Sequence, residues 1–188
     1  VKLVKCGYAV IALETEAPAA IRRTVAFSEA IYTGKQQVED MCGVCAQTLQ
    51  EAYALAMQGM PAILVDPEGE SVRQLHPAAV VDAILAKRNL GTERTMAPFT
   101  VALGPGFTAG RDVDVVIETE RGHDLGRLIY EGEAAVNTGV PGMIAGYGAE
   151  RVIHAPVSGI LHTKAKIADR VQKGDVIAVI ETGKLAEV

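Results

Sequence analysis

The stretch TLQEAYALAMQGMPAILVDP, residues 48–67, holds the clearest secondary-structure signals in the chain. Thr48 with Glu51 three residues later is a capping box, which predicts that a helix begins here. Gly59 is typical of the residue that ends such a helix. The short apolar run Ala62–Val65 then predicts a buried strand. A helix followed at once by a buried strand is the repeating unit of an α/β fold.

Further apolar runs on both sides of this stretch also predict strands. They are Tyr8–Leu13, Val80–Leu85, Phe99–Leu103 and Val113–Ile117. We expect a helix over Ala19–Ile31, and strands that alternate with helices or crossovers indicate a mostly parallel, Rossmann-like sheet. Because Val1–Cys6 resembles the end of a helix, we expect the first strand and glycine loop of the Rossmann unit to precede Val1.

The residue pattern of the sequence changes near residue 120. From there on, Gly, Pro and Asn separate short β-prone runs. We therefore predict a Rossmann-like α/β domain over residues 1–120 and a β-rich module over residues 121–188. The second part is expected to be barrel-sandwich-like.

Composition argues against several classes of protein. The net charge of −5 and the lack of a Lys/Arg block argue against a nucleic-acid partner. No apolar run approaches the ~20 residues of a membrane span. Three cysteines, an odd number, make a disulfide scaffold improbable and fit a reducing cytosol, so we expect a cytoplasmic protein. An oligomer is compatible with all of this.

Polar residues follow the predicted strands where an open parallel sheet binds its ligands, at the strands' carboxyl ends. Glu14 stands where an acidic residue can accept hydrogen bonds from a ribose, and Lys87 with Asn89 could hold an anionic group. The glycine-rich loop Gly104–Gly110 could form a phosphate nest. The alternative is that all of these are solvated turns. The predicted ligand-binding residues are Glu14, Asp66, Lys87, Asn89, Gly104, Gly106, Thr108 and Gly110.

A second group of candidates follows the strand predicted at Val113–Ile117. Glu118, Arg121 and His123 are the possible catalytic residues, because a histidine beside carboxylates can act as an acid, a base or a metal ligand. The remaining histidines are scattered and show no zinc spacing. The sequence leaves open whether the protein is an enzyme.

Cys42 and Cys45 form a CxxC pair. This spacing can provide a redox dithiol or half of a zinc site. No second CxxC occurs in the sequence, so two incidental thiols are the simpler interpretation, and the pair is a weak metal candidate.

The C-terminal segment, from about residue 151, resembles the first half of a biotinyl/lipoyl-type barrel-sandwich module. The resemblance lies in the small-residue turn at Ala155–Ile160 and in the V-x-x-G-D-x-I turn at Val171–Ile177. Lys184 falls where lipoyl domains carry their modified lysine, although Gly183 replaces the usual aspartate. The alternative is an ordinary lysine in an exposed hairpin turn.

Nearly the whole chain resembles one family, the selenium-dependent molybdenum hydroxylase system proteins. The segments that carry the resemblance are Ile21–Ala30, Val65–Pro67, Val81–Lys87, Ala97–Gly110, Val116–Arg127, Asn137–Gly142 and Glu150–Pro156. The resemblance implies an accessory or maturation factor of xanthine dehydrogenase-type enzymes. It implies the hydroxylase or its maturation machinery as partner. The cofactor stays open, and a ligand related to a nucleotide or to molybdenum cofactor at the carboxyl edge of the sheet is our hypothesis. It assigns no catalytic residue.

Two other functions stay open at this point. A carrier module with a modified Lys184 would show an added mass in the intact chain. An NAD(P)-dependent oxidoreductase would show a thermal shift that depends on the nucleotide.

Overall fold

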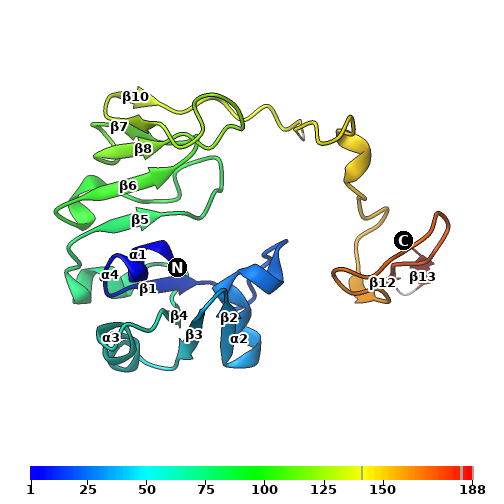
Figure 1. The fold of residues 1–188 in the computed structure, drawn as a ribbon, viewed down its shortest axis with the longest axis horizontal. Coiled ribbons are helices and arrows are strands. Elements are labelled where there is room, and N and C mark those ends of the chain that lie inside the picture. The colour runs from blue at the N-terminus through cyan, green and yellow to red at the C-terminus, as the bar shows by residue number, and fades with distance from the viewer. Residues whose placement is uncertain (141, 183, 188) are drawn as a thin grey trace. The chain divides into compact units, whose positions relative to one another are not determined.

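The computed structural model describes residues 1–140, 142–182 and 184–187, the last four by their backbone. The chain divides into two compact units, Val1–Val136 and Asn137–Val188 (Figure 1). It is a mixed α/β protein with parallel and antiparallel sheets, and within the described residues no sheet closes into a barrel. None of the helices in these residues is long and apolar enough to cross a membrane.

Unit 1, Val1–Val136, contains most of the regular structure. In chain order its elements are α1 (Lys2–Lys5), β1 (Ile11–Glu14), η1 (Arg23–Val25), η2 (Phe27–Glu29), α2 (Ala30–Thr33), β2 (Lys35–Val38), β3 (Met41–Ala46), α3 (Leu49–Met57), β4 (Ala62–Val65), α4 (Glu70–Leu75), β5 (Val80–Asp82), η3 (Arg94–Met96), β6 (Thr100–Leu103), β7 (Thr108–Ala109), β8 (Val115–Ile117), β9 (Leu128–Ile129) and β10 (Gly132–Glu133).

The first sheet has the strand order β1-β4-β3-β2, and β4 runs parallel to both of its neighbours. The helix α3 packs on this sheet, where Ala52 joins the core residues Ala62 and Leu64. The predicted helix cap at Thr48 is confirmed, because the Thr48 hydroxyl accepts the Glu51 N–H at 3.1 Å, whereas the Glu51 carboxylate accepts the N–H of Gln47 at 2.8 Å and not that of Thr48. The strand predicted at Ala62–Val65 is confirmed as β4.

The second sheet has the strand order β5-β6-β8-β9. The strands β5, β6 and β8 are parallel, and β9 is antiparallel to β8. Its core is a cluster of fully or almost fully buried side chains: Ala102, Phe107, Ala109, Val113, Val116 and Ala134. The strand β5 stops earlier than predicted because the Asp82 carboxylate accepts the Ile84 N–H at 3.1 Å, and Leu85 then has φ 58°.

The prediction of one continuous sheet is wrong. The strand β4 pairs with β1 and β3, whereas β5 pairs with β6, and the chain between them forms α4. The strand-end residues Glu14 and Asp66 therefore belong to a different sheet from Lys87, Asn89 and the glycine loop.

The helix predicted at Ala19–Ile31 is also wrong. This segment forms the short turns η1 and η2, and α2 begins only at Ala30. The Arg23 guanidinium donates two hydrogen bonds to Glu29, at 2.8 and 2.6 Å, and its charge lies 5.6 Å from the centre of the Tyr32 ring. Residues six positions apart do not face each other on a helix, so this ion pair needs the folded-back turn.

The hairpin formed by β2 and β3 was not predicted. Its first strand is KQQV, a polar sequence with little β propensity. A two-residue turn at Glu39–Asp40 joins the strands, with Val38 opposite Met41 and Glu39 at φ 53°. Lys5 stabilises the turn through an ion pair with Asp40 at 2.8 Å.

Unit 2, Asn137–Val188, contains η4 (Ala149–Arg151) and an antiparallel sheet of β11 (Ile160–Thr163), β12 (Ala178–Thr182) and β13 (Lys184–Glu187). Gly159 lies directly against the backbone oxygen of Glu181, so a side chain at this position would collide with β12. Residues 121–136, which the sequence placed in the β-rich module, lie in unit 1 because β9 pairs with β8 and β10 with β7.

Candidate functional site

The loops that follow β5, β6 and β8 meet at the carboxyl end of the second sheet. A Cβ atom added to Gly106 would lie 2.5 Å from the Cα of Arg88 and 2.6 Å from its backbone nitrogen. A Cβ atom added to Gly104 would lie 2.5 Å from the Oγ1 of Thr119. Both glycines have positive φ, 109° and 78°. The β6 loop is therefore in contact with the two others, as is expected where parallel strands end.

Three cations lie in these loops and are exposed: Lys87, Arg88 and Arg121. None of them forms an ion pair within the described part of the chain, whereas Arg23, Arg94, Arg111 and Arg127 all do. An unpaired cation beside exposed main chain is suited to holding an anionic group.

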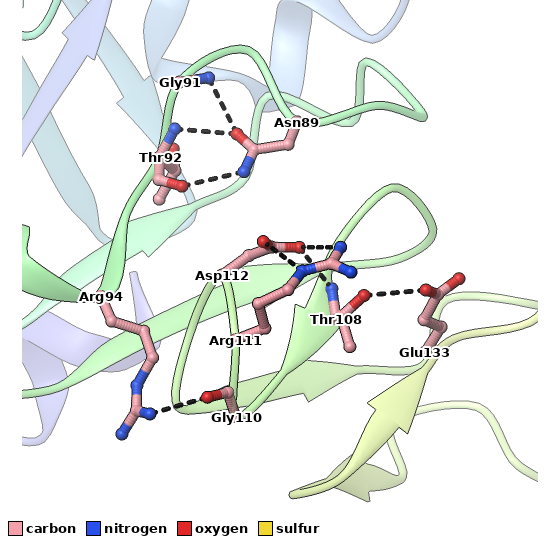
Figure 2. A network of polar contacts seen from close by, with 9 residues as sticks. All are labelled: Asn89, Gly91, Thr92, Arg94, Thr108, Gly110, Arg111, Asp112 and Glu133. Atoms are coloured by element: carbon pink, nitrogen blue, oxygen red, sulfur yellow. Dashed lines mark hydrogen bonds and ion pairs between the residues drawn. The ribbon is translucent and has the colours of Figure 1, made fainter.

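The glycine loop itself offers fewer donors than the sequence predicted. The Gly104 N–H donates to the Ile117 carbonyl at 2.8 Å, and the Gly110 N–H donates to the Val113 carbonyl at 2.7 Å. The Thr108 N–H donates to Asp112 and its hydroxyl to Glu133, both at 2.8 Å (Figure 2). A phosphate at these groups would have to break bonds that hold the fold.

Arg94 fixes the far end of the glycine loop. Its guanidinium donates to the Gly110 carbonyl at 2.7 Å (Figure 2) and to Asp114 at 2.6 and 2.9 Å. The second carboxylate oxygen of Asp114 accepts both the N–H and the hydroxyl of the fully buried Thr100, each at 2.8 Å. These Thr100 bonds, with the Arg94 bond, hold the pKa of Asp114 below its ordinary value. This network is structural.

Asn89 also has a structural role. Its side-chain oxygen accepts the N–H groups of Gly91 and Thr92 at 2.8 Å each, and its amide nitrogen donates to the Thr92 carbonyl at 2.9 Å (Figure 2). The Thr92 hydroxyl in turn donates to the buried Asp82 at 2.6 Å. Asn89 closes the 89–92 turn and shapes the loop beside Lys87 rather than presenting a free amide.

In the first sheet, Asp66 and Glu14 bond to nearby main chain. The Asp66 carboxylate accepts the N–H groups of Glu70 at 3.0 Å and Ser71 at 2.8 Å, together with the Ser71 hydroxyl. Burial raises the pKa of Asp66, but these hydrogen bonds together lower it by more than burial raises it. The pKa of Asp66 therefore lies below its ordinary value. Asp66 thus caps the start of α4. The Glu14 carboxylate accepts the Thr15 N–H at 2.9 Å.

Glu118 is the buried carboxylate at the end of β8, with 6% of its surface exposed. One of its oxygens accepts the N–H groups of Thr119 and Glu120 at 2.7 Å each, and the other accepts the Ala135 N–H at 2.8 Å. Burial raises the pKa of Glu118, yet the three N–H donors lower it more, and the pKa ends below its ordinary value. An ionised carboxylate bonded in this way connects the end of β8 to the segment that follows β10.

Arg121 and His123 lie in the exposed connection between β8 and β9. The loop is closed at its base, where the Glu118 N–H donates to the Arg127 carbonyl and the Gly126 N–H donates to the Glu118 carbonyl, both at 2.9 Å. In the described structure, the Glu118 carboxylate bonds to main chain and no bond joins it to His123. The three candidates therefore do not form a buried acid–base pair.

A depression of about 360 Å³ adjoins this connection. The residues lining it are Glu118, Asp124, Arg127, Leu128, Ile129, Tyr130, Glu131 and Glu133. Its carboxylates outnumber its single arginine, which makes it unsuitable for an anion. Tyr130, Glu131 and Glu133 were not predicted from the sequence, because a carboxylate pair in a Glu-Gly-Glu turn gives no specific signal.

Cys42 and Cys45 both lie in β3. Side chains three positions apart on a strand point to opposite faces, and their Cα atoms are about 10 Å apart, beyond the reach of a disulfide or a shared metal. Within the described residues, no group of His, Cys, Asp and Glu side chains could hold a metal ion. The geometry therefore does not support a dithiol or zinc role for this pair.

This arrangement predicts the behaviour of the thiols on oxidation. After mild oxidation at low protein concentration, denaturation and thiol titration are expected to recover all three cysteines in the reduced form. A loss of the Cys42 and Cys45 thiols in a chain that stays monomeric would contradict the β3 assignment. A Cys42→Ser/Cys45→Ser variant provides the control, and it should titrate as a single thiol.

Lys184 is the first residue of β13, and its backbone pairs with Thr182. Gly183, between them, lies outside the described residues, and for Lys184 the backbone alone is described. The predicted hairpin position is compatible with this register, and the carrier role stays a prediction.

Comparison with known proteins gives one informative match. No protein-family model matches the chain, and no solved structure matches it. The uncharacterized protein YqeB of Escherichia coli (strain K12) is 51% identical over 179 residues, which is 95% of this chain and 33% of that protein. The chain thus spans about a third of the length of the curated relative that it matches, and what it resembles is one part of a longer bacterial protein of uncharacterized function.

Proposed function

We propose that this protein is an accessory or maturation factor of a selenium-dependent molybdenum hydroxylase of the xanthine dehydrogenase type. The support for this is the resemblance of segments spread over the chain, including Val116–Arg127 and Asn137–Gly142. The partner is the hydroxylase or its maturation machinery, and the setting is the cytoplasm. On this proposal the second sheet is the Rossmann-like part, and β11–β13 are half of a barrel-sandwich-like module.

The ligand of this factor is a nucleotide-like or cofactor-like anion, bound where the loops after β5, β6 and β8 meet. The observation that carries this part of the proposal is the packing of Gly106 against the Arg88 backbone, with Lys87 and Arg88 exposed and unpaired in the described residues. Hydrogen bonds from a cation to an anion contribute about 1.5–3 kcal/mol each. Two such bonds contribute about 3–6 kcal/mol, which is less than the roughly 8 kcal/mol of micromolar binding, so main-chain donors at the ligand edge of the sheet have to supply the remainder.

Gene deletion tests the proposal in a host that makes a selenium-dependent molybdenum hydroxylase. Deletion is expected to lower hydroxylase activity, measured as xanthine oxidation in cell extracts, and the wild-type gene is expected to restore it. The charge-reversal variant Lys87→Glu/Arg88→Glu is expected to fail to restore it, because two repelling charges replace the two cations.

The matched control is Arg170→Glu/Lys173→Glu, which reverses two exposed charges in unit 2 and should restore the activity fully. Unchanged hydroxylase activity after deletion would refute the role in this system. If deletion lowers the activity and the Lys87/Arg88 variant restores it as well as the control does, the system assignment holds and the ligand site is wrong.

A further inference from the structure

We infer that the main chain of residues 85–88, and not the glycine loop, is the cradle for a tetrahedral oxyanion of the phosphate class. This inference rests on the proposed function, because it specifies the ligand group and the donors of the same site. The cradle lies in the loop after β5. Side chains hold both ends of this loop, while the N–H groups in its middle have no hydrogen-bond partner in the described residues.

The backbone of this loop alternates in conformation. Leu85 has φ 58° and Lys87 has φ 62°, and Ala86 between them is not in the positive-φ region. Left-handed residues that alternate with residues of negative φ occur in nests, where successive N–H groups bind an anion. In the glycine loop the N–H groups of Gly104, Thr108 and Gly110 are bonded within the fold, and those of Gly106 and the buried Phe107 are the two without a partner in the described residues.

The N–H groups at the centre of the loop are free to bind a ligand. In the described part of the chain, the N–H groups of Ala86, Lys87 and Arg88 have no hydrogen-bond partner, although the neighbouring Ile84 N–H donates to Asp82. On the other side, Asn89 closes the next turn by accepting the N–H groups of Gly91 and Thr92. The ends of the loop are thus held in place, and the conformation of its middle is preset.

Two of the residues in the loop adopt a backbone conformation that is unfavourable for their type. Leucine and lysine are strained at positive φ, and such strain persists where the surrounding structure imposes it, often at ligand sites. Here the loop is confined by Gly106, which contacts the Arg88 backbone so closely that any Cβ atom would collide with it. The Gly106 contact and the bonds at both ends of the loop restrain this backbone conformation before a ligand binds.

The side chains of the same loop match the charge of a dianion. Lys87 and Arg88 are adjacent, exposed and without an ion pair in the described residues. A phosphate-class oxyanion has enough acceptor oxygens to take the three N–H groups and both cations. The shared chemistry is a tetrahedral oxyanion, whose source is either a free ion or the phosphoryl group of a nucleotide.

The test is a titration of the ¹⁵N-labelled full chain at constant ionic strength with inorganic phosphate and, separately, with AMP. Saturable amide shifts at residues 86–88 with both ligands are expected. Tighter binding of AMP identifies a nucleotide, and equal binding identifies a free oxyanion. Shifts confined to residues 104–110, or no saturable shift with either ligand, would overturn the inference.

Two variants separate this cradle from a general effect of charge. Lys87→Gly keeps the N–H and relieves the strained φ, so it should raise Tm slightly while it weakens phosphate binding roughly tenfold through loss of the cation. The control Lys173→Gly should leave binding unchanged. Equal phosphate binding by Lys87→Gly and the wild-type chain would contradict the inferred site. If Lys87→Gly then also restores hydroxylase activity in the deletion host, the proposed role in the hydroxylase system still holds.

Discussion

Replacement of Gly106 by alanine is expected to lower the free energy of unfolding of unit 1 by about 3 kcal/mol, with a fall in Tm of roughly 10 °C. Two effects combine at this position. The new Cβ atom would lie 2.5–2.9 Å from three backbone atoms of Arg88, and φ 109° is unfavourable for a residue with a side chain. Because the opposing atoms belong to the backbone, no side-chain rotation can relieve the collision. Thermal and urea unfolding of Gly106→Ala and the wild-type chain measure the effect.

Gly91→Ala is the matched control for this prediction. Gly91 also has positive φ, 124°, but no atom lies within 4 Å of an added Cβ. It should therefore show the backbone strain alone, about 1 kcal/mol. Equal losses in the two variants would mean that the β5 and β6 loops do not pack as described, and the proposed site would lose its central contact.

Glu118→Gln is expected to cost about 2 kcal/mol at pH 7, because the charged acceptor of three backbone N–H groups is replaced by a neutral amide. If the amide oxygen keeps the bonds to Thr119 and Glu120, the NH₂ group faces the Ala135 N–H, and two donors oppose each other. Urea unfolding measures the loss. Glu131→Gln is the control. The Glu131 side chain lines the same depression but forms no hydrogen bond or ion pair in the described residues, so this substitution should leave the free energy of unfolding unchanged.

The stabilising effect of Glu118 depends on pH in a definite direction. Its pKa in the folded protein lies below the ordinary value of 4.5, so the ionised form is favoured by folding. The contribution is complete above about pH 4.5 and is lost as pH falls through the folded pKa. The stability difference between wild type and Glu118→Gln should accordingly narrow on acidification below pH 4.5. If Glu118→Gln instead has wild-type stability but does not restore hydroxylase activity in the deletion host, Glu118 has a catalytic role.

The parts of the fold that the sequence predicted are those with local signals. The helix cap at Thr48, the stop at Gly59 and the apolar run Ala62–Val65 each act over a few residues, and all three appear in the structure. The hairpin of β2 and β3 depends on pairing rather than propensity, since its first strand is polar. The separation into two sheets depends on which strands pair, and apolar runs do not specify their partners.

The candidate site shows the same division. The rule that ligands bind beyond the carboxyl ends of parallel strands identified the loops after β5 and β6, but it also placed Glu14 and Asp66 at the same edge, and these belong to the first sheet. It could not identify which donors are free, because that depends on contacts distant in sequence. The Thr108 hydroxyl bonds to Glu133, 25 residues away, and Glu118 binds the Ala135 N–H, 17 residues away. Left-handed backbone at Leu85 and Lys87 likewise gives no signal in a sequence without glycine there.

The order of the strands along the chain has a consequence for biosynthesis. In the described structure, every strand of the first sheet ends by Val65, and every strand of the second sheet begins at or after Val80. The first sheet therefore has all of its pairing partners while the remainder of the chain is still being translated. Pairing within the first sheet needs no residue beyond Val65, so this sheet can form during synthesis, before β5 has left the ribosome.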